Sequence, residues 1–387
     1  AVDIPNRKDS ILVREEVKDV REKWLGMLKD LNVCSQKGLV EMFDGSIGAA
    51  SVFMPHGGKY QKTETQAMVA KLPVLTGDCD TVSMMSYGFD PYLSTWSPYH
   101  GAIYAVTESI AKIVAAGGDY SKIRFTFQEY FKRMTEDAKG WGEPMSALLG
   151  AYTAQIGFGL PSIGGKDSMS GTFEQIDVPP TLVSFAVSTA KADHVVSTEF
   201  KNTDSKVILV KPTYLENGLP DFDSIRACFD QVEAIIRDNR AAAIWAVDFG
   251  GVAEGIAKMC FGNFIGFRFT KQLTPEELFQ PCCGAFVIEL NGDAKAEETV
   301  IGTTTNEQTI VCPNYTMQLP QLLQIWEKKL EPVFPCRIKT TTEKPPVYSY
   351  NNPVHQFSTI KTARPNVLIP VFPGTNCEYD TARIFER

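Results

Sequence analysis

Thr181-Leu182-Val183-Ser184-Phe185-Ala186-Val187 is an apolar run rich in β-branched and aromatic residues, which predicts a buried strand. A second run, Lys206-Val207-Ile208-Leu209-Val210, predicts the next strand. Further along the chain, apolar spacing predicts helices at 223–239 and 253–260 and another strand at 285–290. Strands and helices that alternate in this way indicate an α/β or α+β layered domain.

The residues before this stretch predict an N-terminal lobe built on a mixed sheet. The expected elements are a helix within 17–25, strands at 38–43, 49–54 (joined by an Asp44-Gly45 turn), 72–76 and 122–127, and helices at 102–116 and 144–157. We expect the lobe boundary near residue 170. This divides the chain into an N-terminal segment at 1–36, an N-terminal lobe at 37–170 and a C-terminal lobe at 171–336.

Composition excludes several classes of protein. The 387 residues carry a formal charge of −8, which argues against a nucleic-acid binder that works by neutralising phosphates. No apolar run approaches the roughly 20 residues that span a bilayer, so no membrane association is expected. Nine cysteines without zinc-ligand spacing indicate reduced thiols, and hence a cytoplasmic location.

The C-terminal residues predict a break in the fold. Residues 337–363 are poor in aliphatic side chains and are typical of a linker. Residues 364–387 then predict a strand at 366–371, a loop and a helix from Glu378, the first β-loop-α unit of another α/β domain. We therefore expect the chain to be a piece of a longer cytosolic protein.

The most specific local motif is Gly164-Gly165-Lys166-Asp167-Ser168-Met169-Ser170, which we expect to form a polar loop. Adjacent glycines let backbone N–H groups approach an anion, and the Lys, Asp and Ser side chains suit a phosphate or a metal-bridged phosphate. The spacing is not that of a P-loop. An ordinary turn between domains has the same composition, so both interpretations stay open.

Two acidic residues are candidate metal ligands. Asp78 follows Gly77 and a predicted strand, where a carboxylate can hold Mg²⁺ that bridges phosphates. Glu108 lies in an apolar helix, where an unpaired charge is costly, and Lys112 comes four residues later. The structural alternative is that Glu108 and Lys112 form an ion pair and Asp78 only begins a turn.

Two further sites have a functional and a structural interpretation. Asp248-Phe249-Gly250-Gly251 joins a predicted strand to a helix, where N–H groups can face a phosphate or the glycines can simply permit a tight turn. Cys377 precedes the predicted C-terminal helix, which can activate a thiol. No His follows Cys377 to serve as a base, so we expect it not to be a nucleophile.

Taken in order, these motifs resemble the long, single-chain form of the phosphoribosylformylglycinamidine synthase family (formylglycinamide ribonucleotide amidotransferase). The matching segments are Thr65-Gln66-Ala67-Met68-Val69, Gly77-Asp78-Cys79, Gly164 to Ser170, Phe249-Gly250-Gly251, Met259-Cys260-Phe261-Gly262 and Phe372-Pro373-Gly374-Thr375-Asn376-Cys377-Glu378. The resemblance implies the second of two halves with the aminoimidazole-ribonucleotide-synthetase-like fold, each half having two lobes. It also implies the truncated start of a class I glutaminase domain.

The resemblance implies a purine-biosynthesis ligase. ATP phosphorylates the amide oxygen of formylglycinamide ribonucleotide, and ammonia from glutamine displaces the phosphate to give formylglycinamidine ribonucleotide. The family's two halves form two related nucleotide clefts, one catalytic and one that holds a nucleotide as structural support. The implied cofactors are Mg²⁺ and ATP or ADP.

Residue by residue, the resemblance implies that Lys37, Gly77, Asp78 and Asp248 lie at the supporting nucleotide, with Asp78 and Glu108 as Mg²⁺ ligands. Gly164, Gly165, Lys166, Asp167 and Ser168 match the segment that reaches phosphates of the catalytic cleft. The family often has an Asn metal ligand where this chain has Lys112, and an Asp-Arg-Ser-Asp-Gly-Gly run where it has 246–251. We therefore expect Lys112 to replace the cation by pairing with Glu108 and Asp78.

The family's catalytic His belongs to the upstream half, and its glutaminase nucleophile lies beyond Cys377. No catalytic residue is therefore expected in this chain, and we expect it to be inactive alone. The expected partners are the upstream half and the downstream glutaminase domain, and an apolar sheet face could also form a homodimer. The alternative function is a non-catalytic scaffold half with a degenerate nucleotide cleft.

Overall fold

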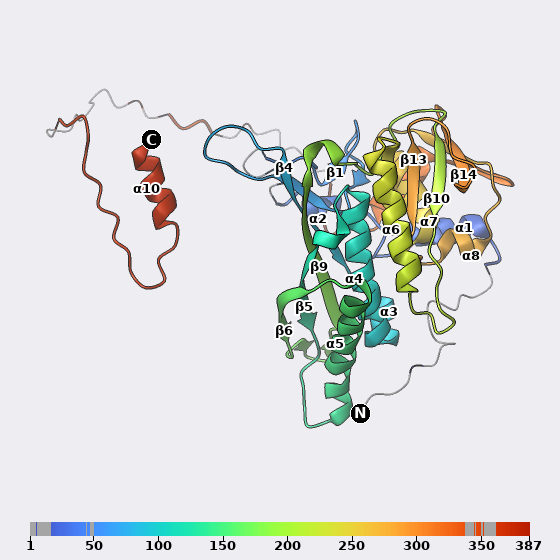
Figure 1. The fold of residues 1–387 in the computed structure, drawn as a ribbon, viewed down its shortest axis with the longest axis horizontal. Helices are drawn as coiled ribbons and strands as arrows, with labels where there is room; N and C mark the ends of the chain where they lie inside the picture. Colours follow the sequence, from blue (N-terminus) through green and yellow to red (C-terminus); the bar gives the residue numbers. More distant parts are fainter. Residues whose placement is uncertain are drawn as a thin grey trace. The chain divides into compact units, whose positions relative to one another are not determined.

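The computed structural model describes residues 5, 17–43, 45–46, 50–336, 344, 346–349, 351 and 361–387. The chain divides into two compact units, Ala1–Ile338 and Lys339–Arg387, and each is described by itself. The first unit contains two large sheets and the helices that cover them (Figure 1). Most of the predicted linker, and most of the predicted N-terminal segment before residue 17, lie outside the described residues.

The first sheet has five strands in the order β3-β4-β9-β5-β6. Their bounds are β3 Met68–Lys71, β4 Thr81–Gly88, β5 Arg124–Tyr130, β6 Ser162–Ser168 and β9 Thr181–Lys191. Only the β5–β6 pair is parallel. The strand predicted at 181–187 is confirmed, but it is the central strand of this first sheet. The predicted boundary near residue 170 is therefore wrong for the sheets, because the chain passes to the second sheet only between β9 and β10.

Helices cover one face of the first sheet. This part of the chain contains α3 Pro91–Trp96, α4 Pro98–Ala115, η3 Tyr120–Lys122, α5 Ala138–Phe158, η4 Ala192–His194 and a small hairpin of β7 Thr172–Phe173 and β8 Ile176–Asp177. The helix α4 is buried on all sides from Gly101 to Ala115, as expected for a helix packed between layers. It ends before Gly117, whose positive φ of 98° stops the helix as predicted.

The second sheet has seven strands in the order β11-β13-β10-β14-β12-β15-β16. Their bounds are β10 Lys206–Val210, β11 Ala241–Ala246, β12 Gly266–Phe269, β13 Phe286–Leu290, β14 Val300–Thr305, β15 Thr309–Cys312 and β16 Tyr315–Gln318. Its helices are α1 Val20–Met27, α6 Phe222–Arg237, α7 Gly251–Phe261, α8 Pro275–Phe279 and α9 Leu319–Lys328. The predicted strands at 206–210 and 285–290 and helices at 223–239 and 253–260 are confirmed.

Two apolar cores hold these layers together. The first joins α4, α5 and α6 to the first sheet and to one face of the second sheet. The second lies on the other face of the second sheet, under α1, α7 and α9, and includes the fully buried Trp24 and Trp326. The α4 and α6 helices therefore lie between the two sheets (Figure 1).

The predicted hairpin over 38–54 does not form. Residues Lys37–Val40 instead make the short helix α2, supported by the Lys37–Glu41 ion pair at helical spacing. Among residues 50–54 only Ser51 bridges a strand, at Ala70. Asp44, at the predicted turn, lies outside the described residues. Two very short strands, β1 His56–Gly57 and β2 Thr63–Glu64, follow.

Two further predicted strands do not form. The strand expected at 72–76 is wrong, since β3 ends at Lys71 and Pro73 has no N–H to extend the ladder. In the second unit, residues 366–371 form no strand, because residues 361–387 offer no neighbouring strand to pair with. The helix predicted from Glu378 is confirmed as α10 Glu378–Glu386.

In the part of the chain that the structure describes, no helix is long and apolar enough to cross a membrane.

Candidate functional site

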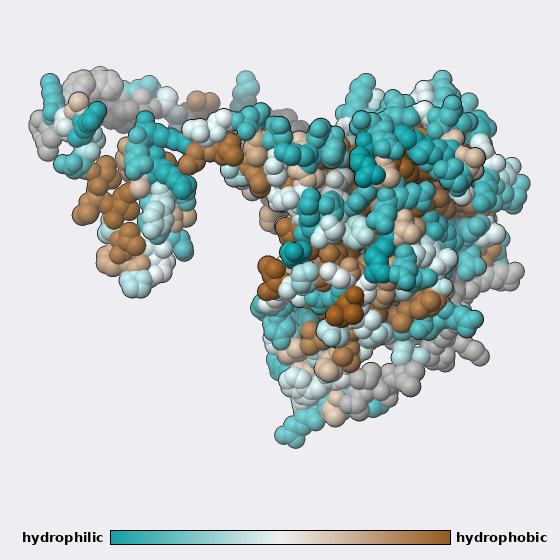
Figure 2. Space-filling view, in the orientation of Figure 1, coloured by the Kyte–Doolittle hydropathy of each residue, from teal (hydrophilic) through white to brown (hydrophobic). Residues whose placement is uncertain are grey.

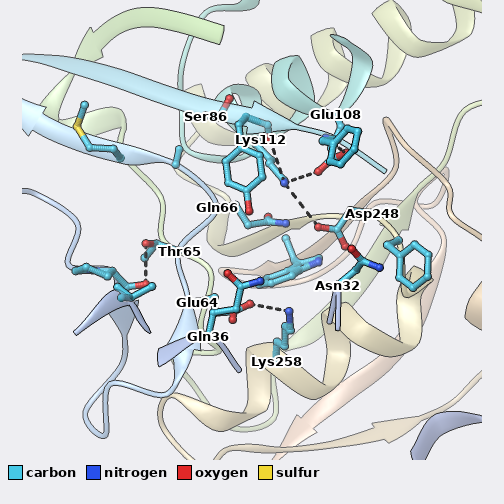
Figure 3. Close-up of a pocket in the computed structure, with 18 of the residues that line it drawn as sticks. Asn32, Gln36, Glu64, Thr65, Gln66, Ser86, Glu108, Lys112, Asp248 and Lys258 are labelled. Atoms are coloured by element: carbon cyan, nitrogen blue, oxygen red, sulfur yellow. Dashed lines mark hydrogen bonds and ion pairs between the residues drawn. The ribbon is translucent and has the colours of Figure 1, made fainter. Parts of the chain in front are cut away.

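A cavity of about 640 Å³ opens in the first unit, where α4 and the first sheet face α7 and the start of the second sheet. Buried and partly buried charged side chains gather around it (Figure 3). We call Glu64, Glu108, Lys112, Asp248, Glu254 and Lys258 the charged cluster. Burying charges requires that they be paired and hydrogen-bonded, so the pairing within this cluster determines what the cavity can bind.

The α4 helix contributes Glu108 and Lys112, one turn apart. The Lys112 ammonium donates to Glu108 Oε1 at 2.5 Å and to the Tyr87 carbonyl at 3.1 Å, and lies 3.9 Å from Asp248 Oδ2. Burial alone would lower the pKa of Lys112, but Glu108 and then Asp248 raise it above its ordinary value. Lys112 therefore stays positively charged at this wall of the cavity.

The α7 helix contributes a second pair with the same spacing. Lys258 Nζ lies 2.7 Å from Glu254 Oε1 and 2.6 Å from Glu64 Oε2 on β2, so it joins α7 to that strand. The ammonium also lies 5.6 Å and 5.7 Å from the ring centroids of Trp245 and Trp326. Glu254 is 2% exposed, and burial followed by the charge of Asp248 raises its pKa to about 8.

Asp248 lies between the two pairs because of the turn that follows β11. Gly250 donates its N–H to Glu254 Oε2 at 2.7 Å, and Gly251 begins α7 with a positive φ of 71°. The two glycines therefore permit a tight turn at the start of α7. Burial, opposed by Lys112 and reinforced by Asp248, raises the pKa of Glu108 to about 7. Asp248 therefore couples the α4 and α7 pairs electrostatically.

Three buried polar atoms that line the cavity have no hydrogen-bond partner among the described residues. They are His56 Nε2, Trp245 Nε1 and Asp248 Oδ1. Burial lowers the pKa of His56 to about 4, so its ring is neutral near pH 7. The cavity thus offers polar atoms to water or to a small ligand, with aromatic side chains such as Phe185 and Phe249 beside them.

The predicted Mg²⁺ ligands do not come together. The Asp78 side chain is 84% exposed, pairs with Lys71 at 3.3 Å and does not line the cavity. Glu108 is already bound to Lys112, which pairs with Asp248 and not with Asp78, so that part of our expectation is wrong. No group of three or more His, Cys, Asp or Glu side chains suited to a metal ion occurs in the described ranges. The donor set therefore does not fit Mg²⁺.

The other residues predicted for the supporting nucleotide are also dispersed. Lys37 pairs with Glu41 at 2.9 Å and donates to the Gln61 carbonyl at 3.0 Å, and it does not line the cavity. Gly77 lies in an exposed turn with a φ of 79°. Of the four predicted residues, only Asp248 lines the cavity.

The Gly164–Ser168 segment is a strand and not the predicted loop. It forms most of β6, an edge strand parallel to β5, with Glu129 opposite Asp167. From Gly164 to Asp167 its residues are exposed, and Ile163 beside them is 80% exposed. The segment therefore presents its Lys, its Asp and unpaired backbone groups along an open edge of the first sheet.

Glu129 gives this edge a testable pH dependence. Burial and then the charge of Asp167 raise its pKa to about 7, from an ordinary 4.5. Because the pKa of Glu129 is higher in the folded chain than in the unfolded chain, its ionisation destabilises the fold as the pH rises from 4.5 to about 7. We expect the difference in melting temperature between Glu129→Gln and the unmodified chain to shift in favour of the variant from pH ~5 to pH ~8. The exposed Glu136→Gln is the control, and an unchanged difference at both pH values would contradict the prediction.

Sequence reasoning missed Glu64, Glu254 and Lys258. Glu64 reaches the cluster only through tertiary contacts, which no local pattern predicts. A signal did exist for the others, because Glu254-Gly-Ile-Ala-Lys258 repeats the spacing and residue types of Glu108-Ser-Ile-Ala-Lys112. In the second unit, Cys377 is exposed at the start of α10.

The first unit has a two-lobe mixed α/β fold of the aminoimidazole-ribonucleotide-synthetase-like class. No protein-family model matches the chain. Its homologues include proteins named phosphoribosylformylglycinamidine synthase subunit PurL. The chain is 22% identical over 290 residues to that of Picrophilus torridus, covering 70% of the chain and 38% of the relative. It is 22% identical over 354 residues to that of Lactobacillus delbrueckii subsp. bulgaricus, covering 84% and 45%.

Solved structures support the fold. Thermotoga maritima PurL complexed with FGAR matches with a TM-score of 0.60 and 13% identity, over 89% of this chain and 58% of that one. The PurLQS structure of the same organism matches with a TM-score of 0.52 and 17% identity, over 70% and 41%. The chain spans less than half the length of each of the two curated relatives, those of Picrophilus torridus and Lactobacillus delbrueckii.

Proposed function

We propose that the chain is one half of the synthetase part of a phosphoribosylformylglycinamidine synthase. The observation that carries this proposal is the shared fold over most of the chain with PurL, which has been solved with FGAR and with ATP. Relatives of the same name match over 84% of the chain but only 45% of their own length. This coverage supports the proposal, because a second half of similar size would account for the part of the relatives that this chain does not match.

In the proposed reaction, the amide oxygen of formylglycinamide ribonucleotide attacks the γ-phosphorus of ATP, and ADP leaves. Ammonia from glutamine then adds to the amide carbon, and phosphate departs to give formylglycinamidine ribonucleotide. The contribution of this chain is the β6 edge, where Lys166 and exposed backbone N–H groups would neutralise and orient phosphate oxygens. Phosphoryl transfer depends chiefly on such positioning.

The outward face of the first sheet supports an upstream half as the partner. Helices cover the other face, while Met85, Val187 and Arg124 form a cross-strand row that faces outward. Tyr87, Val187 and Tyr130 on these strands are 53%, 39% and 41% exposed. Apolar side chains over the region of α5, on the helix-covered side of the sheet, form a separate group (Figure 2). An exposed apolar sheet face of this kind is suited to a protein interface.

The second unit would belong to the downstream partner. Residues 364–387 carry the predicted loop and α10 but have no neighbouring strand in the described part of the unit. We propose that they begin a glutaminase domain, in which Cys377 is not the nucleophile. A cytoplasmic location is proposed with the biosynthetic role.

A second candidate function is a scaffold half with a degenerate nucleotide cleft. The observation that favours it is the charged cluster, in which Lys112 and Lys258 already pair with the carboxylates that line the cavity. In this case the chain would support the partner's cleft without binding a nucleotide in its own.

The proposed function is tested by reconstitution. The chain alone, given ATP, formylglycinamide ribonucleotide and ammonium salts, is expected to form no product, because the catalytic His of the family belongs to the other half. Adding a separately produced upstream half should restore turnover, measured as ADP release and amidine formation. Product formed by the chain alone, or no product with both halves associated, would contradict the proposal.

A further inference from the structure

Two helices from different layers carry the same five-residue motif, Glu-x-Ile-Ala-Lys, at 108–112 in α4 and 254–258 in α7. In each motif the Glu and the Lys lie one turn apart and form an ion pair, at 2.5 Å and 2.7 Å. All four residues are buried, each with less than a tenth of its surface exposed. Both motifs direct their charges to the same cavity (Figure 3).

Each ammonium ion uses more than one oxygen of the cavity wall. Lys112 contacts Glu108, the Tyr87 carbonyl and Asp248, and Lys258 contacts Glu254 and Glu64. Each of the four carboxylates in the charged cluster therefore already has a lysine beside it. Glu108 and Asp248 share Lys112, and Glu254 and Glu64 share Lys258. Mg²⁺ demands near-octahedral oxygen ligands and dehydrates reluctantly, so it would have to displace these contacts.

The charge balance leads to the same conclusion. Two lysine ammonium ions supply the charge of one divalent cation, and they are covalently fixed in place. A further cation at the cavity would lie close to both ammonium ions in a poorly screened interior, where repulsion between like charges is strong. The two ammonium ions thus offset two of the four carboxylate charges of the charged cluster, as many as one divalent cation would.

We propose that Lys112 and Lys258 are resident counter-ions that take the place of a divalent cation at this cavity, so that it needs neither Mg²⁺ nor a metal-bound nucleotide. The inference rests on the proposed function only in that the family supplies the expectation of a metal there. The two Glu-x-Ile-Ala-Lys motifs would then hold the lobes in a fixed arrangement without a ligand. This inference concerns only the cavity and leaves the proposed binding of ATP phosphates at the β6 edge unchanged.

The test is the thermal unfolding of the whole chain in EDTA, in MgCl₂ and in MgCl₂ with ADP. We expect the cavity to contribute no shift, so that any rise in melting temperature with MgCl₂ and ADP is the same in Asp248→Asn as in the unmodified chain. Lys112→Asn removes the ammonium and leaves amide and carboxylate oxygens together. We expect this variant to melt at a lower temperature in EDTA and to recover part of the loss in MgCl₂ or MnCl₂. Lys122→Asn is the matched control, because Lys122 forms an exposed ion pair with Asp119.

A melting temperature of the unmodified chain that rises with MgCl₂ and ADP, and no longer rises in Asp248→Asn, would overturn the inference. A rise that persists in Asp248→Asn would locate nucleotide binding outside the cavity and support it. If Lys112→Asn does not fold, the comparison of the unmodified chain with Asp248→Asn, in EDTA and in MgCl₂ with ADP, still decides the matter. None of these results affects the reconstitution assay, so failure of this inference is distinguishable from failure of the proposed function.

Discussion

Lys258→Met is expected to lower the free energy of unfolding by about 3–5 kcal/mol, the usual result of removing one partner from a buried ion pair. Lys258 is 3% exposed and separates the carboxylates of Glu64 and Glu254. Methionine keeps the length of the side chain but leaves these two carboxylates facing one another. Chemical denaturation near neutral pH measures the loss.

Two further variants show whether the loss comes from the charge. Adding Glu254→Gln to Lys258→Met should recover part of the stability, because one of the unpaired carboxylates is removed. Lys122→Met breaks an ion pair whose lysine is 64% exposed, and it should cost no more than about 1 kcal/mol. A similarly small loss for Lys258→Met would show that the cluster does not hold the lobes together.

Val187→Glu is expected to weaken association with the upstream half, and with it the reconstituted turnover. Val187 is 39% exposed on β9, between Met85 and Arg124, so its replacement should not disturb the core of the chain itself. The new carboxylate would lie opposite Arg124, and an interface that covers this pair must remove both charges from water, which should weaken binding by about tenfold or more. Titration of the labelled upstream half with each variant measures this change.

The matched control places the same charge on another exposed apolar position. Ile156→Glu lies on α5, where Ile156 is 66% exposed, and should leave association unchanged if the outward face of the first sheet is the interface. Equal weakening by both substitutions would contradict the assignment of this face.

Periodic segments of the sequence predicted much of the fold. The long helices α4, α5 and α6 and the strands β9, β10 and β13 have patterns that their burial confirms, because each buries a regular face. Sheet membership could not be predicted in this way. Strand β9 pairs with β4 and β5, and such pairing depends on contacts between distant segments.

The site was less predictable than the fold. Glycine and polar side chains in Gly164–Ser168 suggested a loop, but β5 provides a parallel neighbour that makes the segment an edge strand. Lys112 was correctly expected to pair with Glu108, since their spacing is local. Its second partner, Asp248, is 136 positions away in the sequence, and only the folded chain shows that pairing.

The claim that this chain is half of a paired cleft is tested most directly by the mass of the complex it forms. Analytical ultracentrifugation of the chain mixed with a separately produced upstream half should show a one-to-one species, whose share of the mixture falls with Val187→Glu and is preserved with Ile156→Glu. A chain that stays monomeric in the mixture, or that forms only a homodimer, would contradict the account.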